Sequence, residues 1–197
     1  MELKLLSSDY FYDPSFQLKV IERDPELPYP LHSHDFSELV LIVSGKGVHF
    51  TPKSSFSLLP GHLFIVPPDA LHGYRDVENL HLYNLMFDNQ IFESPFFDLR
   101  NMPGFHSLMK LEAKPGEESL EITPFQLSPT ELAELLPLME QMLKEADSIE
   151  YDIGAKTLAF AYFIHFMVRL FRIEGEHPRH HNPTDRKSTR LNSSHIT

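Results

Sequence analysis

The sequence predicts a mainly β protein, an antiparallel barrel or sandwich, with a pair of helices at its C-terminal end. Between Leu31 and Phe87, short β-rich runs alternate with turn signals, and no helical period fits there. After residue 128, apolar residues recur at helical spacing instead. A chain of 197 residues with 42% hydrophobic content suffices for one core, with or without an appendage. We expect the barrel over residues 1–90, a covering segment with both helices over 91–175, and a polar linker over 176–184.

The first thirty residues are expected to add one or two edge strands to the barrel. Their apolar positions are Phe11, Tyr12, Phe16, Leu18 and Val20. Three prolines follow within six residues, Pro25, Pro28 and Pro30. They exclude helix and predict a stiff extended lead into His32.

The next strands are short and are joined by glycine turns. Leu39–Val43 and Val48–Phe50 are predicted to form a hairpin, with Ser44–Gly47 as the turn, because its glycines can take positive φ. Further strands, with a turn at Pro60–Gly61, are expected at Ser57–Leu59, Leu63–Val66 and Leu80–Phe87.

The segment after Asp88 is expected to cover the barrel and then to form the two helices. Its phenylalanines, Phe92, Phe96, Phe97 and Phe105, should pack on the barrel or on a helix. Ser128, Pro129 and Glu131 predict a capping box at the start of the first helix. Pro137 should kink this helix or shift its start.

The second helix is predicted from Asp152 to about Arg172. Its apolar positions include Leu158, Ala161, Tyr162, His165, Val168 and Phe171, and apolar residues cover nearly all of its circumference. A helix of this kind is buried within the domain or in a subunit interface. For a dimer face we select Leu135, Met139 and Met142 on the first helix, although such a stripe is equally typical of a core.

Composition excludes several classes of function. The chain has no cysteine, which rules out disulfides, cysteine-ligated metals and thiol nucleophiles. A net charge of −11 argues against nucleic-acid binding by this piece alone. No signal peptide or membrane span is visible, so we expect a soluble, cytoplasmic protein with no membrane partner. Nothing in the sequence supports nucleophilic catalysis.

One polar constellation stands out within the β region. His32, His34 and Glu38 are spaced so that an extended strand places them on one face, and His72 can join them from a later strand. Three imidazoles and a carboxylate suit a divalent metal and leave some of its coordination positions open for substrate or water. The same side chains could instead line a metal-free pocket and hydrogen-bond a polar ligand.

Two further side chains, Tyr74 and Asn84, are candidates for binding a polyol, although both could equally serve turns or strand ends. The remaining histidines of this region are isolated, and we expect them at the surface or as satisfied core residues: His49, His62, His81 and His106.

The spacing His32-x-His34-x3-Glu38-x6-Gly45, followed by Gly61-x5-Pro67-x4-His72, resembles the two motifs of the cupin superfamily across residues 26–76. Two departures stand out: Glu26 occupies a position where the first motif usually has Gly, and Asp69 replaces the glycine before the final histidine. The resemblance implies a cupin barrel, a double-stranded β-helix, with the constellation inside it.

The order of parts, with His34-Asp-Phe-Ser-Glu38-Leu, then Leu80-His-Leu-Tyr-Asn84-Leu-Met-Phe87, then two helices, resembles the N-terminal half of AraC/XylS-type transcription regulators. Within that family it is most similar to regulators of rhamnose operons. The resemblance implies a barrel that binds a small effector, commonly a sugar, helices that form a homodimer, and DNA binding through a C-terminal helix-turn-helix module absent from this sequence. It implies no enzyme activity and no required cofactor.

Two other functions fit the same residues: a small metal-dependent cupin enzyme, an isomerase or dioxygenase, and a free-standing sugar-binding module. The last thirteen residues, 185–197, resemble the in-frame translation of a sequencing-library adaptor. We exclude them from the fold and expect that the natural reading frame continues differently beyond Thr184.

Overall fold

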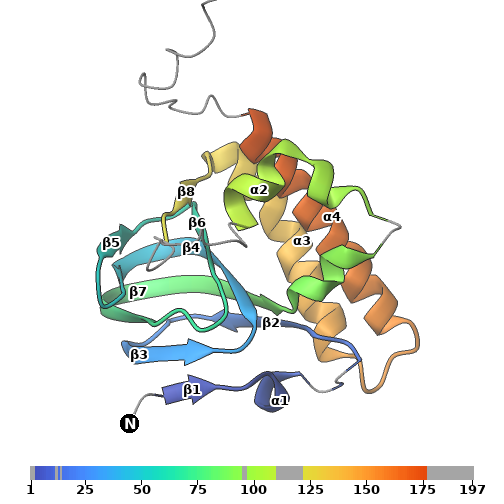
Figure 1. Ribbon diagram of the computed structural model, residues 1–197, viewed down its shortest axis with the longest axis horizontal. Helices are drawn as coiled ribbons and strands as arrows, with labels where there is room; N and C mark the ends of the chain where they lie inside the picture. The colour runs from blue at the N-terminus through green and yellow to red at the C-terminus, as the bar shows by residue number, and fades with distance from the viewer. Residues whose placement is uncertain (1–2, 12, 14, 95–96, 110–121, 177–197) are drawn as a thin grey trace, which may run out of the picture.

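The computed structural model describes residues 3–11, 13, 15–94, 97–109 and 122–176, and it consists of a β-barrel packed against two long helices (Figure 1). The strands are β1 (Leu3–Leu5), β2 (Leu18–Arg23), β3 (Tyr29–His34), β4 (Ser37–Phe50), β5 (Ser55–Leu58), β6 (His62–Val66), β7 (His72–Phe87) and β8 (Phe125–Gln126). The helices are α1 (Ser7–Tyr10), α2 (Pro103–Met109), α3 (Pro129–Asp147) and α4 (Ala155–Glu176), with 3-10 turns η1 (Asn89–Glu93) and η2 (Leu99–Asn101).

Strands β4 and β7 form the spine of the barrel. They pair antiparallel from Ser37 opposite Phe87 to Phe50 opposite Gly73. The first half of β4 also pairs with β6, and the second half pairs with β5. Likewise β2 pairs with the end of β7, whereas β3 pairs with its beginning. The two long strands therefore run through both layers of a small barrel, as the cupin expectation requires.

The hairpin predicted at Ser44–Gly47 is wrong, because β4 continues through this segment without reversing. The pairing of β4 with β7 shifts register three times between Ile42 and Val48, so the glycines accommodate bulges and a bend. Gly45 has a φ of +79°, and a Cβ on it would lie 2.1 Å from the carbonyl oxygen of Asn79. The bend therefore requires glycine at this position.

We predict that Gly45→Ala lowers the free energy of unfolding by about 3 kcal/mol or more, because it adds backbone strain to a backbone clash. Gly154→Ala is the matched control, since Gly154 also has a positive φ of +94° but nothing lies within 4 Å of its Cβ position. It should cost about 1–2 kcal/mol. Urea denaturation measures both, and equal losses would contradict a role for the close approach at the bend.

Both predicted helices are present, with differences at their ends. Ser128 caps α3 and forms the predicted capping box with Glu131. Pro137 lies within α3 at an exposed position, and the helix continues through it. Helix α4 begins three residues later than predicted, at Ala155, and extends to Glu176.

The helices bury different faces from those expected. Leu135, Met139 and Met142 have no exposed surface and belong to the core, so they are unavailable to a second copy and the predicted dimer face is corrected. On α4 the buried residues include Phe163, Phe166 and Leu170. Most of the positions predicted as apolar for α4 point outward or are only partly buried: Leu158, Ala161, Tyr162, His165 and Val168.

The main core joins the helices to one outer face of the barrel. Leu39 and Leu41 of β4 and Leu85 of β7 pack there against α3 and α4. Phe92 and Phe105 are buried in the same core and Phe97 packs at its edge, as expected, whereas Phe96 lies outside the described residues. A second cluster, with Val40, Ile42, Phe64 and Leu82, fills part of the barrel interior. The predicted linker lies outside the described residues except for Glu176, as does segment 185–197.

Candidate functional site

The barrel interior brings His34, Glu38 and His72 together from β3, β4 and β7. Nε2 of His34 lies 3.5 Å from Oε2 of Glu38, and Nε2 of His72 lies 3.7 Å from the same oxygen. All three side chains are buried, and their ligand atoms lie within 4.8 Å of one another. Ligand atoms about 2.1 Å from one ion stand about 3–3.5 Å apart, so this spacing is close to what a divalent metal needs.

Backbone hydrogen bonds orient the imidazoles. Nδ1 of His34 lies 2.7 Å from the carbonyl oxygen of Phe36. Because a carbonyl only accepts, Nδ1 carries a proton, and Nε2 is the ring nitrogen that faces Glu38. The Phe36 ring stacks on the His34 ring at 4.5 Å, which holds the imidazole in this plane. Such a backbone partner on the far nitrogen is the usual support of a metal-ligating histidine.

Several buried polar atoms of this cluster have no hydrogen-bond partner among the described residues. They include Nε2 of His34, Oε2 of Glu38 and both ring nitrogens of His72. An unpaired buried polar atom costs about 1–3 kcal/mol. Natural proteins rarely leave several such atoms together without a partner, so this donor set fits a bound metal or a polar ligand.

His32 departs from the predicted four-ligand set. It is buried beside the other two histidines, with its ring 4.2 Å from that of His72 and 6.3 Å from that of His34. Its Nδ1 lies 3.0 Å from the carbonyl oxygen of Pro30, and it is not among the three residues whose ligand atoms converge. Burial lowers the pKa of His32, so neutral imidazole is favoured.

Sequence reasoning missed His49, which it placed among the isolated histidines. His49 lies on β4 opposite Tyr74, is fully buried, and has no hydrogen-bond partner on either ring nitrogen among the described residues. Its ring stacks on Phe56 and lies 5.5 Å from that of His72. Nothing in the sequence indicated that His49 would face the barrel interior. The bulges in β4 change which side chains of the strand point inward, and the hairpin prediction did not include them.

Tyr74 and Asn84 also lie in the barrel. Tyr74 is buried near His49 and His72, and its hydroxyl has no partner among the described residues. Burial, followed by the charge of Glu38, raises the pKa of Tyr74 well above its ordinary value, so the hydroxyl remains a donor. Asn84 pairs with Val40 across the strands, and its Oδ1 is likewise buried without a partner.

His62, His81 and His106 lie outside the barrel cluster. His81 contacts Glu22 at 2.9 Å, and the hydroxyl of Tyr83 donates to the same carboxylate at 2.8 Å. His62 accepts a long hydrogen bond from the backbone N–H of Leu59, and His106 is exposed. These three agree with the expectation of surface or structural histidines.

The N-terminal arm lies beside the site. Strand β1 pairs with β3, with Leu3 opposite His32 and Leu5 opposite His34. Lys4 forms an ion pair of 2.7 Å with Asp69. Asp69 has a φ of +63°, so it adopts the left-handed backbone at the position where the cupin motif has glycine, a conformation that Asp tolerates better than most residues.

We predict that the metal-free protein loses stability as pH falls from about 6.5 to 4. Burial lowers the pKa of His49 from 6.5 to about 4, so between these values the unfolded chain binds a proton that the folded chain does not. The free energy of unfolding then falls by up to about 1.4 kcal/mol per pH unit for this group alone. His72 and His32, whose pKa values burial also lowers, act in the same direction.

His49→Phe keeps an aromatic ring against Phe56 and removes this titration. Urea denaturation in a chelating buffer at several pH values should show a shallower pH dependence for the variant than for the native chain. Identical slopes would contradict the assignment of a buried, neutral His49.

A small barrel built on two long bent strands, with imidazoles and a carboxylate inside and a helical pair outside, is the architecture of a cupin-type domain. The family model described as AraC-like ligand binding domain matches residues 18–163. The chain therefore belongs to the family of AraC-like ligand-binding domains.

Relatives and solved structures agree with this assignment. The HTH-type transcriptional activator RhaR of Pectobacterium carotovorum subsp. carotovorum (strain PC1) is 36% identical over 85 residues, which are 43% of this chain and 30% of that protein. The chain thus matches less than a third of the length of these relatives. RhaR of Escherichia coli (strain K12) is 34% identical over 86 residues, 44% of this chain and 30% of that protein.

The fold of the chain is similar to that of apo ToxT from Vibrio cholerae strain SCE256, solved as a variant. The TM-score is 0.50 at 11% sequence identity, over 80% of this chain and 57% of that one. At this identity the match shows the fold alone. None of the helices within the described ranges is both long and apolar enough to cross a lipid bilayer.

Proposed function

We propose that this domain senses a sugar inside its barrel and is the effector-binding part of a dimeric transcription regulator. The observation that carries the proposal is the group of buried polar atoms without partners, contributed by β3, β4 and β7 and facing the barrel interior. A ligand rich in hydroxyl groups would supply the missing hydrogen bonds, because each hydroxyl both donates and accepts.

The chemistry of the cluster suits a neutral polyol. Neutral imidazoles offer one donor and one acceptor each, Glu38 accepts, and the Tyr74 hydroxyl can do either. No lysine or arginine is among the buried polar residues of the described chain, so an anionic effector would lack a cationic partner inside the barrel. The resemblance to regulators of rhamnose operons points to the same class of ligand.

A divalent metal is the second occupant that the site supports. His34, Glu38 and His72 would hold it, and the unpaired nitrogens and oxygen are the atoms that would ligate it. The metal would supply Lewis acidity to a bound substrate, and this donor set favours a metal-dependent cupin enzyme as the alternative function. The relatives, which are named as transcriptional activators, favour the regulator.

In the regulator, DNA would be bound by a helix-turn-helix module outside this chain, in the cytoplasm. The net charge of −11 agrees with a separate DNA-binding part. Dimerisation is assigned to the outer face of α4, because Leu158, Ala161 and His165 are exposed there and Tyr162 and Val168 are only partly buried. Tyr151 and Ile153 are also exposed apolar residues, in the turn between α3 and α4.

The sugar proposal predicts a rise in melting temperature with one member of a panel of aldoses and deoxysugars. A ligand that binds only the folded chain stabilises it by about 2.7 kcal/mol at a hundredfold excess over its Kd. Tyr74→Phe should reduce the shift, because it deletes one hydroxyl from the barrel interior. Tyr83→Phe is the matched control, since the Tyr83 hydroxyl is bonded to Glu22 and should leave the response unchanged.

A chelator separates the two occupants. A sugar response that survives chelation supports the sensor. No response to any sugar, together with a melting temperature that falls on chelation and recovers with a divalent metal, would favour the enzyme and contradict the sugar proposal.

The dimer proposal predicts that Leu158→Glu converts a dimer to a monomer, because it places a charge in an apolar contact. Leu59→Glu is the matched control. Leu59 and Leu158 are both 48% exposed, but Leu59 lies in the turn between β5 and β6 and is not part of α4. Sedimentation velocity measures the oligomeric state. A native chain that remains monomeric at high concentration would exclude the interface.

A further inference from the structure

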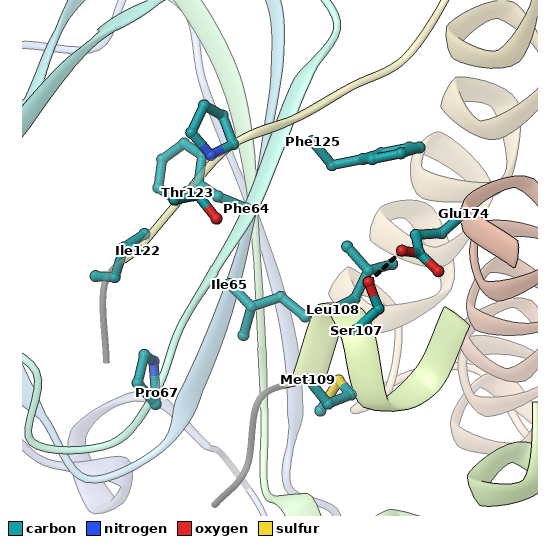
Figure 2. A pocket seen from close by; sticks show the side chains of 11 residues that line it. Phe64, Ile65, Pro67, Ser107, Leu108, Met109, Ile122, Thr123, Phe125 and Glu174 are labelled. Carbon is teal, nitrogen blue, oxygen red and sulfur yellow. Dashed lines mark hydrogen bonds between the residues drawn. The ribbon is translucent and has the colours of Figure 1, made fainter. Parts of the chain in front are cut away.

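A cavity lies outside the barrel, between its edge and the helices. It has a volume of about 200 Å³ and is lined by β6, β8, α2 and the end of α4. Its walls are mixed: Ile65, Leu108 and Phe125 are among the apolar residues, and the polar ones include Ser107 and Glu174. Figure 2 shows Phe125, Ile65 and Leu108 around the space, with Ser107 and Glu174 at one side.

Glu174 is the polar feature of this cavity. Its residue is only 7% exposed, although it lies two positions before the end of α4. The hydroxyl of Ser107 donates a hydrogen bond to Oε1 of Glu174, drawn as a dashed line in Figure 2. The second oxygen, Oε2, is buried and has no partner among the described residues.

A buried carboxylate with one unpaired oxygen is costly, and the cost is offset when a cation with N–H donors meets it. The apolar walls add a second requirement, an apolar body attached to that cation. The volume is below the range usual for drug-sized ligands, so the occupant is small. A cationic N–H donor balances a carboxylate charge and makes the stronger hydrogen bond, whereas an anion would be repelled.

We infer that this cavity binds a small amphiphilic amine, with its ammonium group on Oε2 of Glu174 and its apolar body against Ile65, Leu108 and Phe125. The site is distinct from the barrel cluster and does not depend on the proposed sugar effector. Because its walls come from the barrel strands and from both α2 and α4, an occupant would join the barrel edge to the end of the last helix.

Isothermal titration of the full chain with phenethylamine tests the inference, in phosphate buffer because amine buffers would compete. The neutral analogue 2-phenylethanol has the same apolar body without the charge. We expect saturable binding of the amine at one site, and binding of the alcohol weaker by about tenfold or more, the loss of one charge-assisted hydrogen bond.

Glu174→Gln retains an oxygen that accepts from Ser107 and removes the charge, so it should weaken amine binding by about the same factor and leave alcohol binding unchanged. Glu38→Gln is the control for the other buried carboxylate, in the barrel, and should bind the amine as the native chain does. Thermal melts establish that each variant is folded.

Three results would overturn the inference: no saturable amine binding, equal affinity for amine and alcohol, or amine binding that is lost in Glu38→Gln and kept in Glu174→Gln. If Glu174→Gln does not fold, the amine and alcohol affinities of the native chain, together with Glu38→Gln, decide the question.

Discussion

The fold depends on the pairing of β4 with β7 along nearly their whole length. Each strand takes part in both layers of the barrel. The bend that the two strands share therefore determines how the two layers are placed relative to each other. Gly45 allows that bend because the carbonyl of Asn79 occupies the space of a side chain. The positions of Glu38 near one end of β4 and of His49 near the other follow from it, and His72 lies between them at the start of β7.

The interior that this pairing creates is unusually polar for a core. Four imidazoles and a carboxylate are buried there: His32, His34, His49, His72 and Glu38. An aliphatic interior of the same volume would avoid the cost of unpaired polar atoms. The polar arrangement therefore lowers the free energy of unfolding of the ligand-free barrel. The surrounding apolar clusters, which join the helices to the barrel's outer face and fill the rest of its interior, hold the costly centre in place.

The sequence predicted correctly those features that neighbouring residues determine by themselves. The capping box at Ser128 needs only three neighbouring residues, and the turn at Pro60–Gly61 needs only two, with Gly61 at a φ of +83°. The cupin spacing predicted the convergence of Glu38, His34 and His72. The parity argument was wrong, because it assumed one continuous strand, whereas His34 ends β3 and Glu38 lies on β4.

Features that depend on contacts between distant segments could not be predicted from the sequence. Glycines at 45 and 47 fit a hairpin turn and a bulged strand equally well, and only the position of β7 decides between them. For the same reason His49 was not assigned to the interior. On α4, apolar residues occur on every side, so periodicity could not tell that Phe163 and Phe166 face the core while Leu158 faces outward.

Alternation along β4 connects the two parts of the domain physically. Glu38 and Val40 face the barrel interior, whereas Leu39 and Leu41 pack in the core shared with α3 and α4. Because one strand carries both sets, a ligand that displaces the backbone at Glu38 also displaces Leu39 in the core. A close-packed core resists small displacements and favours discrete arrangements, so an effector with different affinity for two such arrangements would shift the helices along with the site.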